Sequence, residues 1–119
     1  MTIPAIIDCD PGHDDVMAIL LGGRTLDLKG ITTVHGNAPL SLTTKNARKL
    51  AELADLTHIP IAAGMDRPLV REPRFAPEVH GQTGLDGPDL PEPTIPILSE
   101  HAVEFIYRTA MEVDDLHLL

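Results

Sequence analysis

Four aspartates near the start of the chain are the side chains best suited to do chemistry. Asp8, Asp10, Asp14 and Asp15 lie within residues 6–19, whose sequence is IIDCDPGHDDVMAI. Carboxylates that converge on one small volume repel one another, so some must take up protons or turn into water unless a cation lies between them. Calcium takes about six to eight oxygen ligands, and magnesium keeps a stricter octahedral geometry. The cluster therefore predicts a site for a hard divalent cation.

The residues around the aspartates help to decide which acidic motif they form. A single aspartate could simply cap a helix, but four together favour a functional site. A calcium-binding EF-hand loop that opens at Asp8 needs glycine and glutamate where this chain has His13 and Ile19, so that motif is excluded. A phosphatase of the haloacid dehalogenase type, with Asp8 as nucleophile, stays open as an alternative. Asp8 and Asp10 fit its pattern, but Gly12 stands where threonine or valine is usual.

The elements that must position these aspartates follow an alternating pattern. Residues 3–7 form a short apolar run that ends abruptly in acids, as a buried parallel strand does at its carboxyl end. A helix is expected to begin near Asp14, because Val16, Ile19 and Leu20 recur at helical spacing. Further strands are predicted over residues 28–34 and 60–63, and a helix over residues 41–54 whose apolar face holds Ala47, Leu50, Ala51 and Ala54. This order predicts an α/β fold: an open, mostly parallel, Rossmann-like sheet with flanking helices.

The second half of the chain is expected to contain one long loop, one helix and the start of a fourth strand. Residues 64–96 hold seven of the eleven prolines, which predicts a loop. A helix is predicted to resume from Ser99, with Val103, Ile106, Tyr107 and Ala110 on one face. Residues 116–119 look like the opening of a fourth strand. We therefore expect residues 1–119 to be the amino-terminal part of a single domain, incomplete after that strand begins.

Composition and charge exclude several classes of function. The chain is 43% hydrophobic and 23% charged, as is usual for a soluble folded protein. Its net charge of -9 repels polyanions, so no nucleic acid partner is expected. The apolar run at residues 16–21 is too short to cross a bilayer, so no membrane partner is expected. The only cysteine, Cys9, cannot form an internal disulfide, and the expected location is cytoplasmic.

Four blocks of sequence, in order, resemble the inosine-uridine-preferring nucleoside hydrolase family. Residues 6–19 resemble its opening signature, Asp-x-Asp-Pro-Gly-x-Asp-Asp. ITTVHGN at residues 31–37 resembles its second strand and Gly-Asn turn. PIAAG at residues 60–64, followed by Arg67, Pro68 and Leu69, resembles its third strand, and HGQTGLDG at residues 80–87 resembles its His-Gly loop. The similarity covers essentially the whole chain.

The resemblance implies hydrolysis of the N-glycosidic bond of ribonucleosides, with calcium as cofactor. Asp10 would be a calcium ligand and also the general base that takes a proton from a calcium-bound water. Asp15 would be a bidentate calcium ligand, and Asp8 would orient the cluster from behind the ligands. In this family, further calcium ligands come from segments beyond Leu119. A non-catalytic remnant that binds calcium or ribose is the other alternative, besides the phosphatase.

The resemblance also implies how a small-molecule nucleoside would bind. Asp14 would accept hydrogen bonds from the ribose hydroxyls, Asn37 would lie near the attacking water, and His80 would face the nucleobase. Cys9 is expected only to pack, and no chemical role is expected for the remaining histidines, His13 included. At full length, the protein is expected to be a homo-oligomer.

Overall fold

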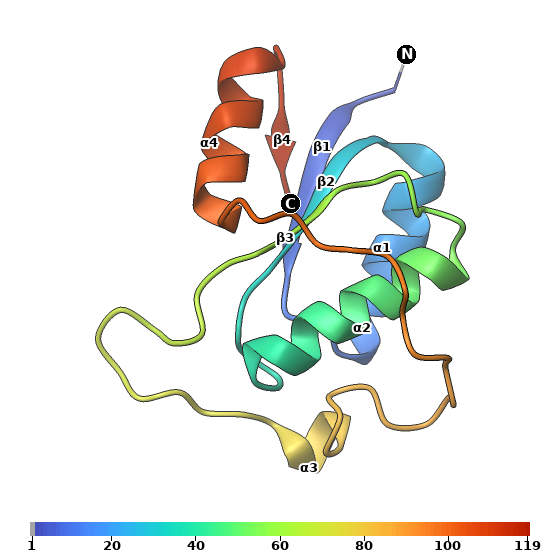
Figure 1. The fold of residues 1–119 in the computed structure, drawn as a ribbon, viewed down its shortest axis with the longest axis vertical. Coiled ribbons are helices and arrows are strands. Elements are labelled where there is room, and N and C mark those ends of the chain that lie inside the picture. Colours follow the sequence, from blue (N-terminus) through green and yellow to red (C-terminus); the bar gives the residue numbers. More distant parts are fainter. Residues whose placement is uncertain (1) are drawn as a thin grey trace.

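The computed structural model describes residues 2–119, in which strands and helices alternate (Figure 1). The elements in chain order are β1 (Pro4–Cys9), α1 (His13–Thr25), β2 (Asp27–Thr33), α2 (Leu40–Leu53), β3 (Ile61–Ala63), α3 (Pro77–His80), α4 (Ala102–Glu112) and β4 (His117–Leu118). Each predicted strand is present, with its ends shifted by up to two residues. The expected helices at the aspartate cluster and over residues 41–54 begin at His13 and Leu40.

The strands form one parallel sheet in the order β3-β2-β1-β4. The chain first adds strands to one side of β1 and then crosses over to place β4 on the other side. The gap between β1 and β4 is therefore the point at which the strand order reverses. Open α/β sheets bind ligands at the carboxyl ends of their strands at such a point. This topology confirms the predicted fold class.

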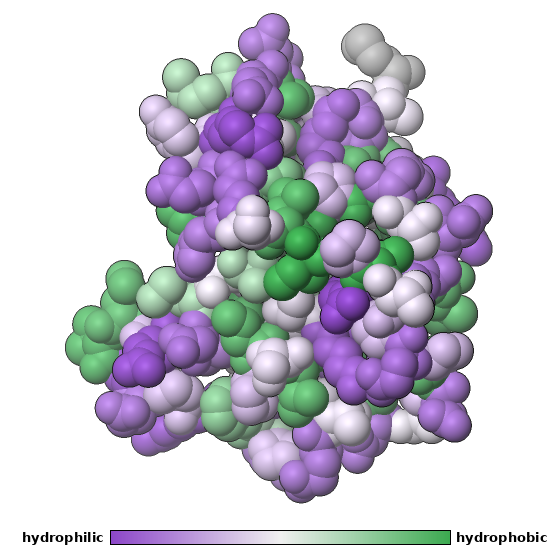
Figure 2. Space-filling view, viewed as in Figure 1, coloured by the Kyte–Doolittle hydropathy of each residue, from purple (hydrophilic) through white to green (hydrophobic). Residues whose placement is uncertain are grey.

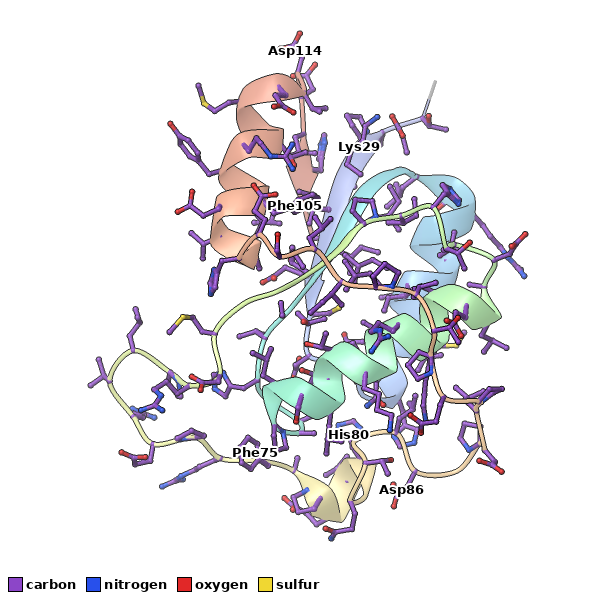
Figure 3. All side chains as sticks on the ribbon, viewed as in Figure 1. Lys29, Phe75, His80, Asp86, Phe105 and Asp114 are labelled. Carbon is purple, nitrogen blue, oxygen red and sulfur yellow. The ribbon has the colours of Figure 1, made fainter. Side chains whose placement is uncertain are left out.

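Helices cover both faces of the sheet and create two apolar cores. On one face, Ile7, Ile31 and Ile61 occupy matching positions in three neighbouring strands and pack against α1 and α2. On the other face, Ile6 and Phe105 belong to a smaller cluster beneath α4. Figure 3 shows Phe105 directed from α4 toward the strands. The alternation of side chains along each strand explains why Ile6 and Ile7 enter different cores.

The apolar face predicted for α4 is wrong. Helix α4 begins at Ala102 rather than near Ser99, and it buries Ala102, Phe105 and Thr109 against the sheet. Val103 and Tyr107, two members of the predicted face, are 60% and 66% exposed. Both sides of this helix carry apolar residues at helical spacing, so periodicity alone cannot identify the side that faces the core.

The predicted loop over residues 64–96 is largely irregular but contains the short helix α3. Its first part projects away from the sheet (Figure 1), and Figure 2 shows apolar surface at the projecting edge of the molecule. Leu69 and Val70 of this part are almost fully exposed. Its last part is tied to α2. Arg48 donates hydrogen bonds to the carbonyl oxygens of Pro93 and Ile95, and Glu52 accepts one from the Ile95 backbone. Among residues 2–119, no helix is long and apolar enough to span a bilayer.

Candidate functional site

The predicted site residues gather at one end of the sheet. Asp10 follows the end of β1, Asn37 follows β2, and His80 lies at the end of α3. Lys29 marks the opposite end, near the start of β2, and Figure 3 shows Lys29 and His80 at opposite ends of the molecule. The parallel topology brings Asp10 and Asn37 together, because their strands end at the same edge of the sheet. His80 reaches the same place from α3, in the long loop.

Asp10 is held in place by the Gly36-Asn37 turn. The Asn37 backbone N–H donates to Asp10 Oδ2 at 2.8 Å, and the Asn37 side-chain amide donates to the Asp10 carbonyl oxygen at 2.9 Å. A Cβ atom on Gly36 would clash with Asp10 Oδ2, so only glycine leaves room for this contact. Asn37 thus anchors the carboxylate that the family resemblance makes the general base.

Asp15 has the electrostatic environment expected of a cation ligand. Its Oδ2 atom is buried and has no hydrogen-bond partner among residues 2–119. Burial raises the pKa of Asp15, the negative charges of Asp14 and Asp10 raise it further, and the backbone groups of Asp10 and Gly12 partly oppose these effects. A bound cation would remove the repulsion and give the buried oxygen a partner. Asp10 and Asp15 therefore fit a divalent ion.

The other two aspartates do not complete a set of metal ligands. Asp8 is exposed, and its Oδ1 accepts a hydrogen bond from the Thr32 hydroxyl at 2.5 Å. Asp14 is exposed in the first turn of α1. Within residues 2–119, no group of three or more His, Cys, Asp or Glu side chains is arranged to hold a metal ion. The four aspartates are neighbours in sequence, but their environments in the fold differ.

His80 lies against the β1–α1 turn and next to Asn37. A Cβ atom on Gly12 would come within 2.6 Å of His80 Nδ1 and 2.7 Å of Asn37 Nδ2. The ring of His80 stacks on that of His13, with 5.3 Å between centroids and 17° between planes. His13 had no expected role, yet it contacts a predicted substrate-binding residue. It occupies one of the two variable positions of the signature, so the motif gave no reason to single it out.

Asn46 is a second residue that sequence reasoning missed. It is buried in α2, and its amide donates to the carbonyl oxygens of Pro11 at 3.2 Å and Thr83 at 3.0 Å. One side chain thereby joins the turn that carries the aspartates to the loop that follows His80. The sequence contained a signal for this role. Asn46 directly precedes Ala47 of the predicted apolar face, which made it a candidate for burial, and a buried amide needs hydrogen-bond partners.

Cys9 packs, as expected. Its side chain is 5% exposed, and its Sγ atom lies 3.6 Å from the Thr32 carbonyl oxygen. Burial, and then the charges of Asp15, Asp8 and Asp10, raise the pKa of the thiol far above its usual range. The thiolate is the reactive form of cysteine, so this residue is chemically inert in the folded protein.

Two hollows adjoin the site. A groove of about 390 Å³ runs from Asp8 and Asp15 along apolar side chains of β1 and α1. A smaller hollow of about 220 Å³ is bordered by Asn37, Phe75 and Gln82. Asp8 and Asp15 therefore border the first hollow and Asn37 borders the second, whereas Asp10 and His80 line neither of them.

Comparison with known proteins identifies the family. The family described as inosine-uridine preferring nucleoside hydrolase matches residues 5–119. The pyrimidine-specific ribonucleoside hydrolase RihA of Escherichia coli K12 is 45% identical over 114 residues, which cover 94% of this chain and 37% of that protein.

Solved structures agree with that match. A plant nucleoside hydrolase, PpNRh1, superposes with a TM-score of 0.86 at 30% identity, covering 99% of this chain and 39% of its own. An inosine-guanosine nucleoside hydrolase superposes with a TM-score of 0.85 at 29% identity, covering 38% of its own length. The chain thus spans little more than a third of the length of these proteins. A match over nearly all of its residues shows that the chain belongs to the inosine-uridine preferring nucleoside hydrolase family.

Proposed function

We propose that the protein hydrolyses the N-glycosidic bond of ribonucleosides to ribose and free nucleobase, with Asp10 as the general base. The relatives it matches are named as ribonucleoside hydrolases. The observation that carries the proposal is the setting of Asp10. Its carboxylate is fixed by the Asn37 backbone at the carboxyl edge of the sheet, beside the buried and unpartnered Oδ2 of Asp15.

The residue types suit the chemistry of this bond. Breaking an N-glycosidic bond develops positive charge on the ribose ring, so nearby carboxylates stabilise the transition state more than the neutral substrate. The hydrogen bond from Asn37 engages only Oδ2 of Asp10 and holds the carboxylate in one orientation. A fixed general base of this kind typically contributes about 10²- to 10⁴-fold to the rate.

Asp10 and Asp15 would hold a calcium ion. The buried oxygen of Asp15 and its raised pKa both favour a cation at this position. When bound, calcium would orient the attacking water and the ribose hydroxyls and make that water more acidic. Two carboxylates supply at most four oxygens, fewer than the roughly six to eight that calcium prefers. Residues 2–119 therefore provide part of the ligand set.

The other predicted residues would bind the nucleoside around Asp10. Asp14 is exposed at the start of α1 and is free to accept hydrogen bonds from ribose hydroxyls. Asn37 contacts Asp10 directly, which suits a place near the attacking water. His80 lies within reach of the same turn, and its ring suits the nucleobase end of the substrate.

Release of ribose from inosine, uridine and cytidine by the purified protein tests the proposal. The Asp10→Asn variant keeps the shape of the side chain but removes the base, so we expect kcat to fall by about 10²-fold or more. Asp27→Asn is the matched control, because Asp27 forms an ion pair with Lys29 at 2.7 Å near the start of β2, far from the site. Equal activity in the two variants would refute the role of Asp10. Absence of ribose release from wild-type protein with calcium present would refute the function itself.

A further inference from the structure

The short connection between β2 and α2 carries the residue that fixes Asp10. It comprises residues 34–39, between the end of β2 and the start of α2 (Figure 1). Asn37 donates from its backbone to Asp10 Oδ2 and from its side chain to the Asp10 carbonyl oxygen. Gly36 lies so close to Asp10 Oδ2 that a Cβ atom there would clash. The position of this connection therefore sets the position of the Asp10 carboxylate.

A buried threonine in the first turn of α2 reaches back to the start of the connection. The hydroxyl oxygen of Thr43 lies 2.9 Å from the carbonyl oxygen of Val34 and 3.1 Å from that of Leu40. A carbonyl oxygen can only accept, so the hydroxyl donates. The Leu40 carbonyl belongs to the helix, whose own N–H groups supply a donor. No backbone N–H among residues 2–119 donates to the Val34 carbonyl, so the Thr43 hydroxyl is the donor that this oxygen needs.

The burial of Thr43 indicates that its hydroxyl is there for this contact. The side chain is fully buried. A hydroxyl removed from water costs free energy unless it is hydrogen-bonded, and valine would fill nearly the same space without that cost. The hydrogen bond to Val34 offsets the cost and joins the end of β2 to α2.

The connection is also held from two other directions. The Val34 backbone N–H donates to the Cys9 carbonyl oxygen in β1 at 3.0 Å, and the His35 backbone N–H donates to that of Met65 at 3.1 Å. Both bonds fix the connection to the sheet side and to the long loop. Within residues 2–119, Thr43 makes the one side-chain hydrogen bond that α2 contributes to residues 34–39. Its removal would therefore free the connection on the side of α2.

We propose that Thr43 is a positioning residue for Asp10: its hydroxyl holds the end of β2 on α2 and so places the Asn37 amide against the Asp10 carboxylate. The catalytic part of this role rests on the proposed function, in which Asp10 takes a proton from water. A shift of the connection would lengthen the hydrogen bond from Asn37 and turn the carboxylate. Misplacement of a reacting group by about 1 Å can cost about 10²-fold in rate. Thr43 thus acts on catalysis through Asn37.

Amide hydrogen exchange and NMR test the positioning without any need for activity. Thr43→Val keeps the shape of the side chain but removes its hydroxyl, whereas Thr43→Ser keeps the hydroxyl. In Thr43→Val, we expect the backbone amide of Asn37 to exchange about tenfold faster, the scale of one lost hydrogen bond. Its proton resonance should move upfield as the bond to Asp10 lengthens, and Thr43→Ser should stay near wild type. An unchanged Asn37 amide in folded Thr43→Val would overturn the proposal.

Thr44→Val is the matched control on the same helix. The Thr44 and Thr33 hydroxyls are 2.7 Å apart in the core, so this variant also loses a buried hydrogen bond but keeps the donor of the Val34 carbonyl. Its Asn37 amide should behave as in wild type. Equal changes in Thr44→Val and Thr43→Val would show that any loosening of α2 moves the connection, and would refute the specific role of Thr43.

A second pair of variants serves if Thr43→Val does not fold. Thr43→Ser and Thr43→Ala differ only by the hydroxyl, so the Asn37 amide should exchange faster in the alanine variant than in the serine variant. Identical Asn37 signals in these two folded proteins would overturn the proposal as well.

Kinetics at saturating calcium separate this proposal from the proposed function. We expect Thr43→Val to lower kcat for ribonucleosides about tenfold and to change KM less than about twofold, because Asp10 acts on the water in the transition state. Thr43→Ser should recover most of kcat. A wild-type protein without hydrolase activity, whose Asn37 amide still changes in Thr43→Val, would leave the anchoring by Thr43 standing and refute the function. Full activity in Thr43→Val with an unchanged Asn37 amide would refute the positioning role and leave the function standing.

Discussion

The aspartates at the start of the chain are chemically alike but have different environments. Asp8 is exposed and accepts from the Thr32 hydroxyl, whereas Asp10 accepts from the Asn37 backbone. Asp15 has a buried oxygen without a partner among residues 2–119, and Asp14 is exposed. Identical carboxyl groups can therefore serve as base, metal ligand and substrate contact, because each meets a different set of neighbours.

At the residue scale, the raised pKa of Asp15 predicts a dependence of stability on pH. Folding raises this pKa above its ordinary 3.8, through burial and then the charges of Asp14 and Asp10. The protonated carboxyl therefore stabilises the fold below pH 3.8, and this contribution is lost as the pH rises through the folded pKa. In Asp15→Asn the side chain is neutral at every pH, so this contribution to stability cannot be lost. With a chelator at neutral pH, we expect Asp15→Asn to be more stable than wild type by roughly 0.5–1 kcal/mol, the scale of a partly solvated charge interaction.

Urea unfolding of both proteins between about pH 3 and pH 7, roughly the range over which a carboxyl of this kind titrates, measures this difference. Calcium should make wild type the more stable of the two proteins, because it stabilises only the protein that keeps the Asp15 carboxylate. Asp27→Asn again serves as control, since the Asp27 carboxylate is already paired with Lys29. A wild-type protein that stays the more stable one in chelator at neutral pH would show that Asp15 carries no electrostatic strain.

At the element scale, the sequence was sufficient to predict the strands of the sheet and most of the residues that meet at its edge. Apolar runs that end in polar residues identified the strands, and the parallel topology then brought Asp10 and Asn37 to one edge. His80 reaches that edge from α3, which the predicted loop did not include. The face of α4 was predicted wrongly, because the side with Val103 and Tyr107 is as apolar in pattern as the side that the fold buries. Contacts between segments far apart in sequence, such as that of His13 with His80, have no periodicity from which to infer them.

Helix α2 supports the site through Asn46, and this predicts the effect of its removal. Asn46→Ala leaves the carbonyl oxygens of Pro11 and Thr83 without their donor. We expect a loss of about 1–3 kcal/mol in the free energy of unfolding, the usual cost of leaving buried polar groups unsatisfied. The amides that follow Thr83 should also exchange faster, since the loop loses its link to α2. Urea denaturation and hydrogen exchange measure the two effects.

Lys45→Ala is the matched control on the same helix. Lys45 forms an ion pair with Glu92 at 2.8 Å in which both side chains are more than a third exposed, so its loss should change stability little. Asn46→Asp is the sharper variant, because it places a carboxylate against two carbonyl oxygens and should destabilise the protein more than alanine does. Stability in Asn46→Ala equal to that of Lys45→Ala would exclude a bridging role for α2.

At the scale of the whole molecule, the layers place the acidic cluster where binding of a cation would affect the stability of the fold. The sheet is covered by α1 and α2 on one face and by α4 on the other, so the strand ends form a rim between the layers (Figure 1). β1 lies in the interior of the sheet, between β2 and β4, and carries both Cys9 and the start of the cluster. A cation held by Asp10 and Asp15 would bind only the folded chain and would stabilise the fold as a whole.

Cys9 can report this coupling, because its thiol is buried in β1 and becomes reactive only when the sheet opens. Binding that is restricted to the folded state stabilises it by about 2.7 kcal/mol at a ligand concentration of about 100 times Kd, a factor of about 100 in the open population. Calcium at that concentration should therefore slow labelling of Cys9 by a thiol reagent about 100-fold, provided that labelling follows global opening. In Asp15→Asn, calcium should not slow labelling, and potassium at equal ionic strength should have no effect on either protein. Labelling that calcium slows equally in wild type and Asp15→Asn would place the ion elsewhere and remove Asp15 from the metal site.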